Sequence, residues 1–179
     1  MARRYFRFVL DEGEMRHFTL LDGAVGGLIA GWIAFIAAMI TAFAAGLPTV
    51  LPWRLAASVV LGRPALRMDW GLGLGLLGLL VHFALCIAFG MLWVTLAREL
   101  WPSLRDNLGT HTALAAFYGL LIWLLDIQFI ARGLFPWFLG FGSFAQLLLH
   151  ALAYGLPLGL YVATRVREVD AQVESESHA

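Results

Sequence analysis

Four long stretches of this chain contain no Asp, Glu, Lys or Arg, and they set the class of fold. They cover residues 23–53, 70–97, 107–125 and 133–164. A helix needs roughly 20 apolar residues to cross a hydrocarbon core of about 30 Å, and each stretch is close to that length or longer. Because backbone polar groups must be paired inside lipid, each stretch predicts a membrane-spanning α-helix.

The overall composition excludes an ordinary soluble domain. Hydrophobic residues make up 61% of the chain and charged residues 13%, about half the usual share in soluble domains. The formal net charge is zero and no basic patch interleaves with the aromatic residues, so a nucleic-acid partner is also excluded. The sequence therefore predicts an all-α integral membrane protein that folds as a four-helix bundle.

The membrane domain is expected at residues 19–165, with spans at about 22–46, 71–97, 111–135 and 139–164. Residues 1–18 mix arginines with aromatic rings, which is typical of an interfacial segment on anionic headgroups. Pro52 and Gly62 flank a stretch too short to cross, so Trp53 to Leu61 predicts a short interfacial or re-entrant helix between the first two spans. Residues 166–179 are typical of a disordered acidic tail.

The arginines are distributed unevenly about the four spans. Eight arginines lie on the side that holds both termini and the second connection (3, 4, 7, 16, 98, 105, 165 and 167), and four lie on the other side (54, 63, 67 and 132). Basic residues concentrate on the cytoplasmic side of membrane proteins. This bias predicts that both termini are cytoplasmic.

Two histidines are expected at one depth in the membrane. Gly71 and Leu139 begin two expected spans that run in the same direction. His82 lies 11 residues after Gly71, and His150 lies 11 residues after Leu139. At 1.5 Å per residue both are roughly 16 Å down, close to the midplane. Each follows a Leu-x-His pattern, so the chain is consistent with two helical hairpins related as a parallel repeat.

The matching depth of His82 and His150 fits two interpretations. Two imidazoles that face one another across a bundle are able to ligate a b-type haem, with neighbouring glycines making room for the macrocycle. Alternatively, each neutral histidine donates a hydrogen bond to a neighbouring helix and fixes the packing. The packing interpretation is favoured, because one histidine per helix is a weak signal for a cofactor.

Asp126 and Arg132 are candidate buried polar residues in the third span, because a charge at the centre of a span is costly unless it is paired or used. Arg132 shares a helix face with Gln128, four residues earlier. Asp126 is expected to pair with His111, with Tyr118 or with a group on another subunit, and a continuous proton path is not visible.

Small residues recur at helical spacing and are candidate packing faces, because small-xxx-small patterns let membrane helices approach closely. The helix-packing candidates are Gly23, Gly27 and Gly31 in the first span, Gly78 and Gly90 in the second, and Gly155 and Gly159 in the fourth.

Several of these patterns together are similar to a known family. The run Gly23 to Gly31, the run Arg54 to Gly62, His82 with Gly90, and His150 with Gly155 and Gly159 resemble the YagU-like small bacterial inner-membrane proteins. The resemblance implies four spans and a location in the bacterial inner membrane. It offers no activity to transfer.

The sequence contains no nucleophile with a paired base, no zinc-ligand spacing and no phosphate-binding loop, so it does not predict an enzyme. Glycine faces and Asp126 without an evident partner favour an accessory subunit that packs against other integral membrane subunits and lipids. The expected host is a respiratory or photosynthetic electron-transfer complex. No cofactor is expected for such a subunit. The alternatives are a small bis-histidine haem-b electron carrier and, less favoured, a transporter or channel.

Overall fold

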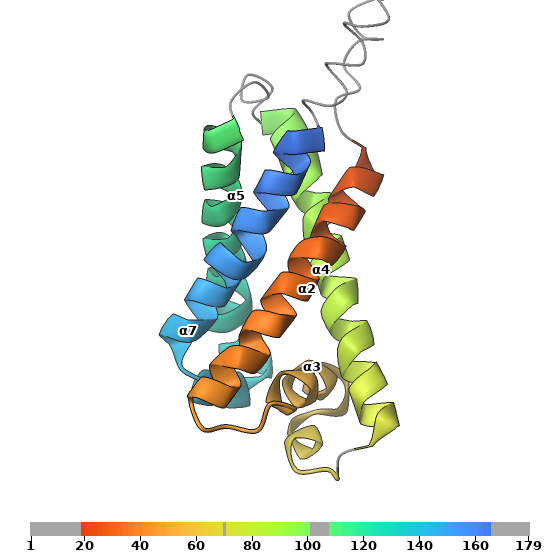
Figure 1. Ribbon diagram of the computed structural model, residues 1–179. Helices are drawn as coiled ribbons and strands as arrows, with labels where there is room; N and C mark the ends of the chain where they lie inside the picture. Colours follow the sequence, from red (N-terminus) through yellow and green to blue (C-terminus); the bar gives the residue numbers. More distant parts are fainter. Residues whose placement is uncertain (1–18, 70, 101–107, 166–179) are drawn as a thin grey trace, which may run out of the picture.

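Helices form all the regular structure in residues 19–69, 71–100 and 108–165, which the computed structural model describes (Figure 1). Within these ranges four helices are long and apolar enough to cross a membrane: Leu20–Ala44, Leu72–Glu99, Leu108–Leu134 and Ser143–Arg165. The prediction of an all-α, four-span membrane bundle is confirmed. The expected interfacial segment at 1–18 and acidic tail at 166–179 lie outside the described residues.

The first span, α2 (Leu20–Ala44), begins two residues before the predicted start because Thr19 and Asp22 cap it reciprocally. The Asp22 carboxylate accepts a hydrogen bond from the Thr19 backbone N–H at 2.7 Å, and the Thr19 hydroxyl accepts one from the Asp22 N–H at 3.3 Å. Asp22 also lies 3.6 Å from Arg165 at the end of the fourth span. The first and last described helices therefore begin and end at the same end of the bundle (Figure 1).

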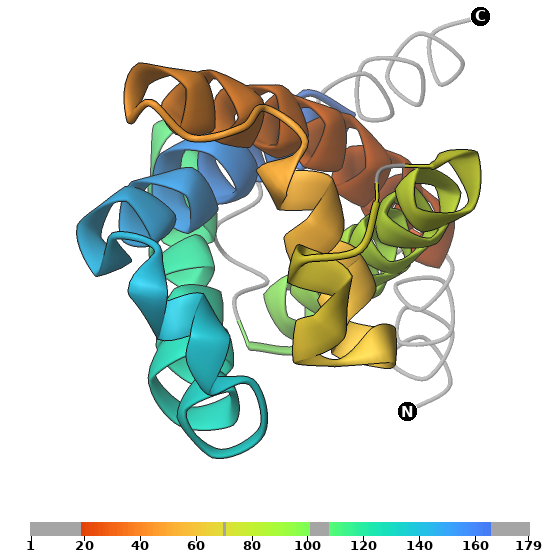
Figure 2. The same ribbon diagram turned by 90° about the horizontal axis from the view of Figure 1, so that it is seen from below.

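The short helix expected between the first two spans is present as α3 (Leu51–Leu61), followed by the 3₁₀ turn η1 (Arg63–Leu66). Seen along the bundle, α3 crosses the end opposite the start of α2 (Figure 2), where the backbone of Trp53 packs against Gly78 of α4. The Trp137 indole N–H donates to the Ser58 hydroxyl at 2.9 Å, which ties α3 to the connection between the last two spans.

The second span is α4 (Leu72–Leu100), and the third is built from α5 (Leu108–Trp123), the π-helical η3 (Leu124–Ile130) and α6 (Ala131–Leu134). The 3₁₀ turn η4 (Pro136–Gly140) follows. The fourth span contains α7 (Ser143–Leu148) and the π-helical η5 (Leu149–Gly155) and ends at Arg165. It begins four residues after the predicted position 139, because η4 and the left-handed Gly142 (φ +37°) interrupt the helix.

The spans pack as two hairpins, α2 with α4 and α5 with η5, through glycines that admit backbone contact. A Cβ on Gly27 would collide with the carbonyl oxygen of Cys86 in α4, and one on Gly119 would collide with that of His150 in η5. Such close approach replaces the missing hydrophobic force between helices in lipid. The hairpins then meet through contacts between α2 and η5.

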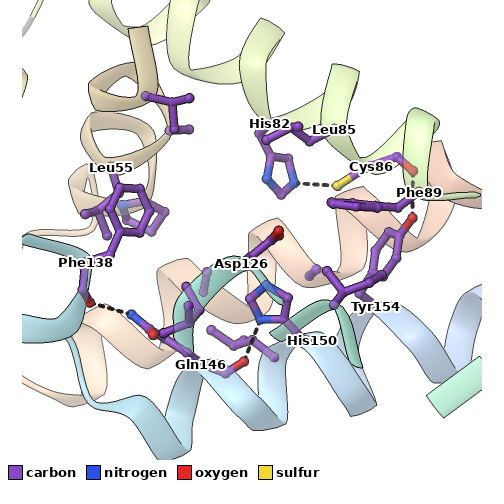
Figure 3. A pocket seen from close by; sticks show the side chains of 18 of the residues that line it. Leu55, His82, Leu85, Cys86, Phe89, Asp126, Phe138, Gln146, His150 and Tyr154 are labelled. Carbon is purple, nitrogen blue, oxygen red and sulfur yellow. Dashed lines mark hydrogen bonds between the residues drawn. The ribbon is translucent and has the colours of Figure 1, made fainter. Parts of the chain in front are cut away.

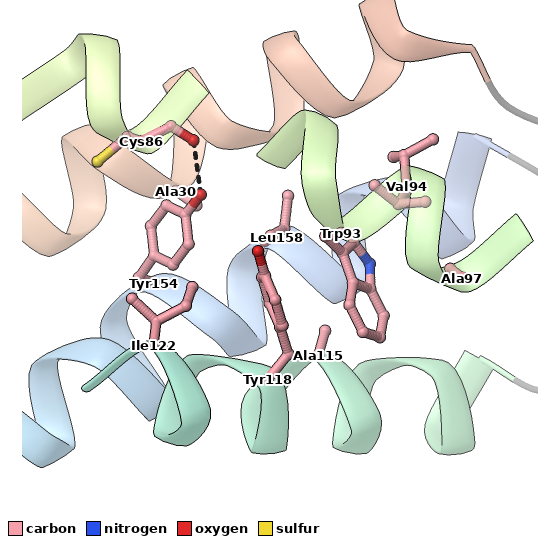
Figure 4. Packing of buried hydrophobic residues seen from close by; sticks show 11 residues of the cluster. Ala30, Cys86, Trp93, Val94, Ala97, Ala115, Tyr118, Ile122, Tyr154 and Leu158 are labelled. Carbon is pink, nitrogen blue, oxygen red and sulfur yellow. Dashed lines mark hydrogen bonds between the residues drawn. The ribbon is translucent and has the colours of Figure 1, made fainter. Parts of the chain in front are cut away.

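The core of the bundle fills the half that contains the start of α2 and the end of the fourth span, and Figure 4 shows its packing. Trp93 of α4 and Leu158 of the fourth span are at most 2% exposed. The Tyr118 ring of α5 lies 5.3 Å from the Trp93 ring, and its hydroxyl donates to the carbonyl of Phe89 at 2.9 Å. Large aromatic side chains thus fill the space between α4 and α5 in this half.

A candidate ligand cavity inside the bundle

The other half of the bundle contains a cavity of about 360 Å³. It begins where the core ends, since Ile122 and Tyr154 belong to both. Its walls come from all four spans, from α3 and from η4, and they are mainly aliphatic and aromatic. The lining side chains with chemistry beyond packing are His82, Cys86, Asp126, Gln146, His150 and Tyr154.

Figure 3 shows how these side chains are arranged around the cavity. His82 and Cys86 come from α4 on one side, and Asp126, Gln146 and His150 lie across from them. The two histidines predicted to be at one depth therefore line one cavity, on opposite walls. Their hydrogen bonds, however, give them different roles.

His82 is held within the wall between α4 and α2. Its Nε2 donates to the carbonyl oxygen of Gly31 at 3.0 Å, and the Cys86 sulfur lies 3.5 Å from the same nitrogen. Its ring packs against those of Phe35 and Phe83, with centroids 5.1 Å away in each case. This is the interhelical hydrogen bond that the packing interpretation expects.

His150 uses the opposite ring nitrogen. Its Nδ1 donates to the carbonyl oxygen of Gln146, one turn earlier, at 2.7 Å. In a neutral imidazole with a proton on Nδ1, Nε2 is an acceptor. His150 therefore presents an acceptor atom in the cavity lining.

The residues present do not fit a bis-histidine haem. A histidine that ligates a metal usually donates its second N–H to a carbonyl or carboxylate and leaves the other nitrogen for the metal. Both histidines donate one N–H in this way, but His150 keeps Nε2 at the tip of its ring, whereas His82 uses Nε2 for Gly31 and keeps only Nδ1, beside its own backbone. In addition, no glycine lines the cavity: Gly78 is pressed against the backbone of Trp53, and Gly90 against that of α2.

Two of the lining residues lie on π-helical segments, which the sequence did not predict. Asp126 is in η3 and His150 is in η5. At the end of each segment a backbone N–H bonds to the carbonyl five residues earlier, from Ala131 to Asp126 and from Leu156 to Ala151. A π-turn is less stable than an α-turn and occurs frequently at functional sites. Both departures from α-helix thus fall at the cavity.

The two candidate buried polar residues of the third span, Asp126 and Arg132, differ in their burial. Asp126 is half-buried at the cavity, and within the described residues no hydrogen bond or ion pair joins its carboxylate to another group. Tyr118, one expected partner, donates to Phe89 instead. The predicted burial of Arg132 is wrong: it is exposed in the last turn of the span, and its guanidinium donates to Gln128 at 2.8 Å.

The glycines singled out as packing faces all contact other helices of this same chain. In the first span Gly23 and Gly27 face Gly90 and Cys86, and a Cβ on Gly31 would lie 2.9 Å from the Cβ of Cys86. In the fourth span Gly155 and Gly159 face α5 at Ala115. These glycines therefore hold the bundle itself together, and they do not indicate a surface for another subunit.

Two residues of the cavity wall are also exposed on the outside of the bundle. Leu85 of α4 is 45% exposed, and Ile130 of η3 is 37% exposed. Both side chains are apolar and belong to spans, so their exposed parts face the region where lipid chains would lie.

Sequence reasoning missed Gln146 and Tyr154 as residues of the site. The Tyr154 hydroxyl donates to the Cys86 carbonyl at 2.6 Å, and the Tyr154 side chain lies at the boundary between the cavity and the core. Gln146 lies four residues before His150, and this i, i+4 spacing was a signal that both share one helix face. Within the described residues, no three His, Cys, Asp or Glu side chains group closely enough to hold a metal ion.

No family model, curated protein or solved structure matches this chain.

Proposed function

We propose that this protein binds a lipid-soluble small molecule inside the membrane, in the cavity between the four spans and α3. The observation that carries this proposal is the composition of the cavity wall: it is apolar throughout, apart from a few polar side chains that converge from different helices. Small-molecule sites are typically concave, of roughly 300–1,000 Å³, and lined in this way. The volume of about 360 Å³ falls in that range.

Two further features support the proposal. The π-helical segments η3 and η5 place Asp126 and His150 at the cavity, and π-turns are retained most often where function requires them. The lining residues Leu85 and Ile130 are also exposed on the outside of the bundle, on the side from which a ligand that partitions into lipid would arrive.

The features that favoured an accessory subunit are accounted for inside the chain. The glycine faces pack on neighbouring helices, and Asp126 faces the internal cavity. A role as an accessory subunit of a larger membrane complex stays a prediction with no support from this geometry.

A matched pair of variants tests binding. Ala38 of α2 lines the cavity, and Ala88 of α4 is exposed and does not line it. Phenylalanine at position 38 fills space that a ligand needs, whereas phenylalanine at position 88 projects into lipid or detergent. Native mass spectrometry of the protein extracted in mild detergent is expected to show a bound lipophilic molecule in the wild type and in Ala88→Phe, and to show its loss in Ala38→Phe. An equal signal in both variants contradicts the proposal.

Transport of the bound molecule is a second candidate, favoured by the π-helical segments in two spans beside converging polar groups. Transporters place substrate sites near the bilayer midplane, where helices depart from regular α-geometry. Flux of the ligand across proteoliposomes, lost in Ala38→Phe and kept in Ala88→Phe, is the expected result for a transporter. Binding without flux assigns the protein as a carrier or sensor instead.

A further inference from the structure

Four polar side chains that line the cavity each donate a hydrogen bond inside the protein. His82 donates to Gly31, His150 to Gln146, Gln146 to Phe138 and Tyr154 to Cys86, in each case to a backbone carbonyl oxygen. Backbone carbonyls accept only, so these bonds also fix which atom of each side chain remains.

Three of the lining side chains keep acceptor atoms without a partner. The Gln146 Oε1 is buried and has no hydrogen-bond partner within the described residues. His150 retains the lone pair of Nε2, and the Asp126 carboxylate has no described partner. Buried acceptors without partners are rare in folded proteins because each one loses the hydrogen bonds it makes in water.

The cavity lining contains an acidic side chain and no permanently basic one. Asp126 is the only carboxylic acid among the lining residues, and no arginine or lysine lines the cavity. An isolated charge near the centre of a span is costly, so a cationic partner stabilises the ionised form. Neither Arg132, which bonds to Gln128, nor any described ion pair supplies that cation.

From these observations, and resting on the proposed function, we infer that the ligand is a lipophilic amine, bound as its ammonium ion with Asp126 as counter-ion. An ammonium group offers several N–H donors and a positive charge, which matches the carboxylate of Asp126, the Oε1 of Gln146 and the Nε2 of His150. The aliphatic part lies along the apolar wall formed by residues such as Leu55 and Val59.

Aromatic rings in the wall add to this match. Phe89, Phe135, Phe138 and Tyr154 line the cavity. Ring faces attract a desolvated cation within about 6 Å of the centroid, and they offer no comparable attraction to an anion. A fatty acid or an anionic lipid would bring a second negative charge to Asp126 and find acceptors where it needs donors. A neutral alcohol would satisfy one acceptor and leave the charge of Asp126 uncompensated.

Three probes with the same alkyl chain separate these head groups: dodecylamine, dodecanol and dodecanoic acid. Their binding to the full chain in mild detergent is measured by native mass spectrometry and by the shift in thermal unfolding. The expected order is dodecylamine tightest, with an affinity at least about tenfold above that of dodecanol, which corresponds to about 1.4 kcal/mol, and dodecanoic acid weakest. The Ala38→Phe variant gives the background from detergent partitioning for each probe.

Variants assign the recognition to residues. Asp126→Asn removes the charge and is expected to abolish the preference for the amine over the alcohol. Asp69→Asn, at an exposed aspartate that does not line the cavity, is expected to leave that preference unchanged. If Asp126→Asn does not fold, Gln146→Leu keeps the charge and removes one acceptor, and it is expected to weaken dodecylamine binding several-fold.

The outcomes separate this inference from the proposed function. Dodecanol or dodecanoic acid binding as tightly as dodecylamine, with all binding sensitive to Ala38→Phe, overturns the amine and leaves the cavity as a binding site. An amine preference that persists in Asp126→Asn also overturns it. If no probe binds above the Ala38→Phe background, the proposed function itself fails.

Discussion

His82 in α4 and Gly31 in α2 are joined by a hydrogen bond of 3.0 Å from the imidazole Nε2 to the backbone carbonyl oxygen. The bond crosses between the two helices of the first hairpin at the level of the cavity. It commits Nε2 at the tip of the His82 ring and leaves only Nδ1, beside the helix backbone, whereas His150 keeps Nε2 as an acceptor for a ligand. The two histidines at matching positions in the two hairpins therefore act differently.

Alanine substitutions of His82 and His150 are expected to affect different properties of the protein. His82→Ala removes an interhelical hydrogen bond, about 0.6 kcal/mol on average in membrane proteins, together with ring contacts to Phe35 and Phe83. It should lower the Tm. His150→Ala breaks only a bond within its own helix, so it should change the Tm less and weaken ligand binding more. Thermal unfolding and dodecylamine binding, measured on both variants, check this pair. A larger loss of binding in His82→Ala would contradict the assignment.

The protein is expected to be colourless when it is isolated from cells replete in haem. Ligation of iron by the Nε2 of His82 would require the bond to Gly31 to break, and the cavity wall contains no glycine to admit the macrocycle. The measurement is a visible absorption spectrum of the purified protein. A Soret band that disappears in both His82→Ala and His150→Ala would reinstate the haem.

Gly27→Ala is expected to destabilise the bundle, because the new Cβ would collide with the Cys86 carbonyl oxygen in α4. Overpacking of this kind typically costs about 1–3 kcal/mol. Gly73→Ala is the matched control: it is also in a span, and nothing lies within 4 Å of its Cβ position. The Tm of Gly27→Ala should fall, and that of Gly73→Ala should stay the same or rise. Equal Tm values would show that α2 and α4 are not packed as described.

The spans and the contact face of the first one could be predicted from the sequence because they follow from local features. Uncharged runs of sufficient length give the spans, and the fourfold spacing of Gly23, Gly27 and Gly31 gives the contact face. The partner of that face could not be predicted, because a glycine stripe packs equally well on a helix of its own chain and on another subunit. That ambiguity led to the prediction of an accessory subunit.

Only part of the candidate site could be predicted from the sequence, because the rest depends on contacts made in the folded bundle. The depth of His82 and His150 follows from counting residues, but the ring nitrogen that each one uses depends on which carbonyl lies nearby in the folded bundle. The π-turns at Asp126 and His150 have no signal in a single sequence. Arg132 was expected to be buried because it lies in a span, yet in the last turn its side chain reaches the exterior.

Ser58→Ala is expected to loosen α3 from the connection between the last two spans. The Ser58 side chain is fully buried, and its hydroxyl accepts the hydrogen bond from the Trp137 indole. Leaving a buried donor unsatisfied costs roughly 1–3 kcal/mol. Thr95→Ala is the control, since Thr95 is exposed and its hydroxyl bonds only to Met91 in its own helix. The measurement is the Tm of each variant, and an equal effect of both would contradict the role of Ser58.

The orientation of the bundle is expected to place both termini in the cytoplasm. The beginnings of α2 and α5 and the end of α4 lie at one end of the bundle, and α3 lies at the other (Figure 1). Eight of the twelve arginines flank the first end, and basic residues concentrate on the cytoplasmic side.

Single cysteines test this orientation on a Cys86→Ser background, which removes the chain's one native thiol. Thr49, exposed between α2 and α3, should react as Thr49→Cys with a reagent that does not cross the membrane when the reagent is applied from outside. Ser103→Cys, in the connection between α4 and α5, should react only after the membrane is permeabilised. Because the two positions lie in connections at opposite ends of the spans, their labelling patterns must be complementary. The reverse pattern would invert the orientation and leave the fold unchanged, whereas labelling of both from outside would contradict the four-span topology.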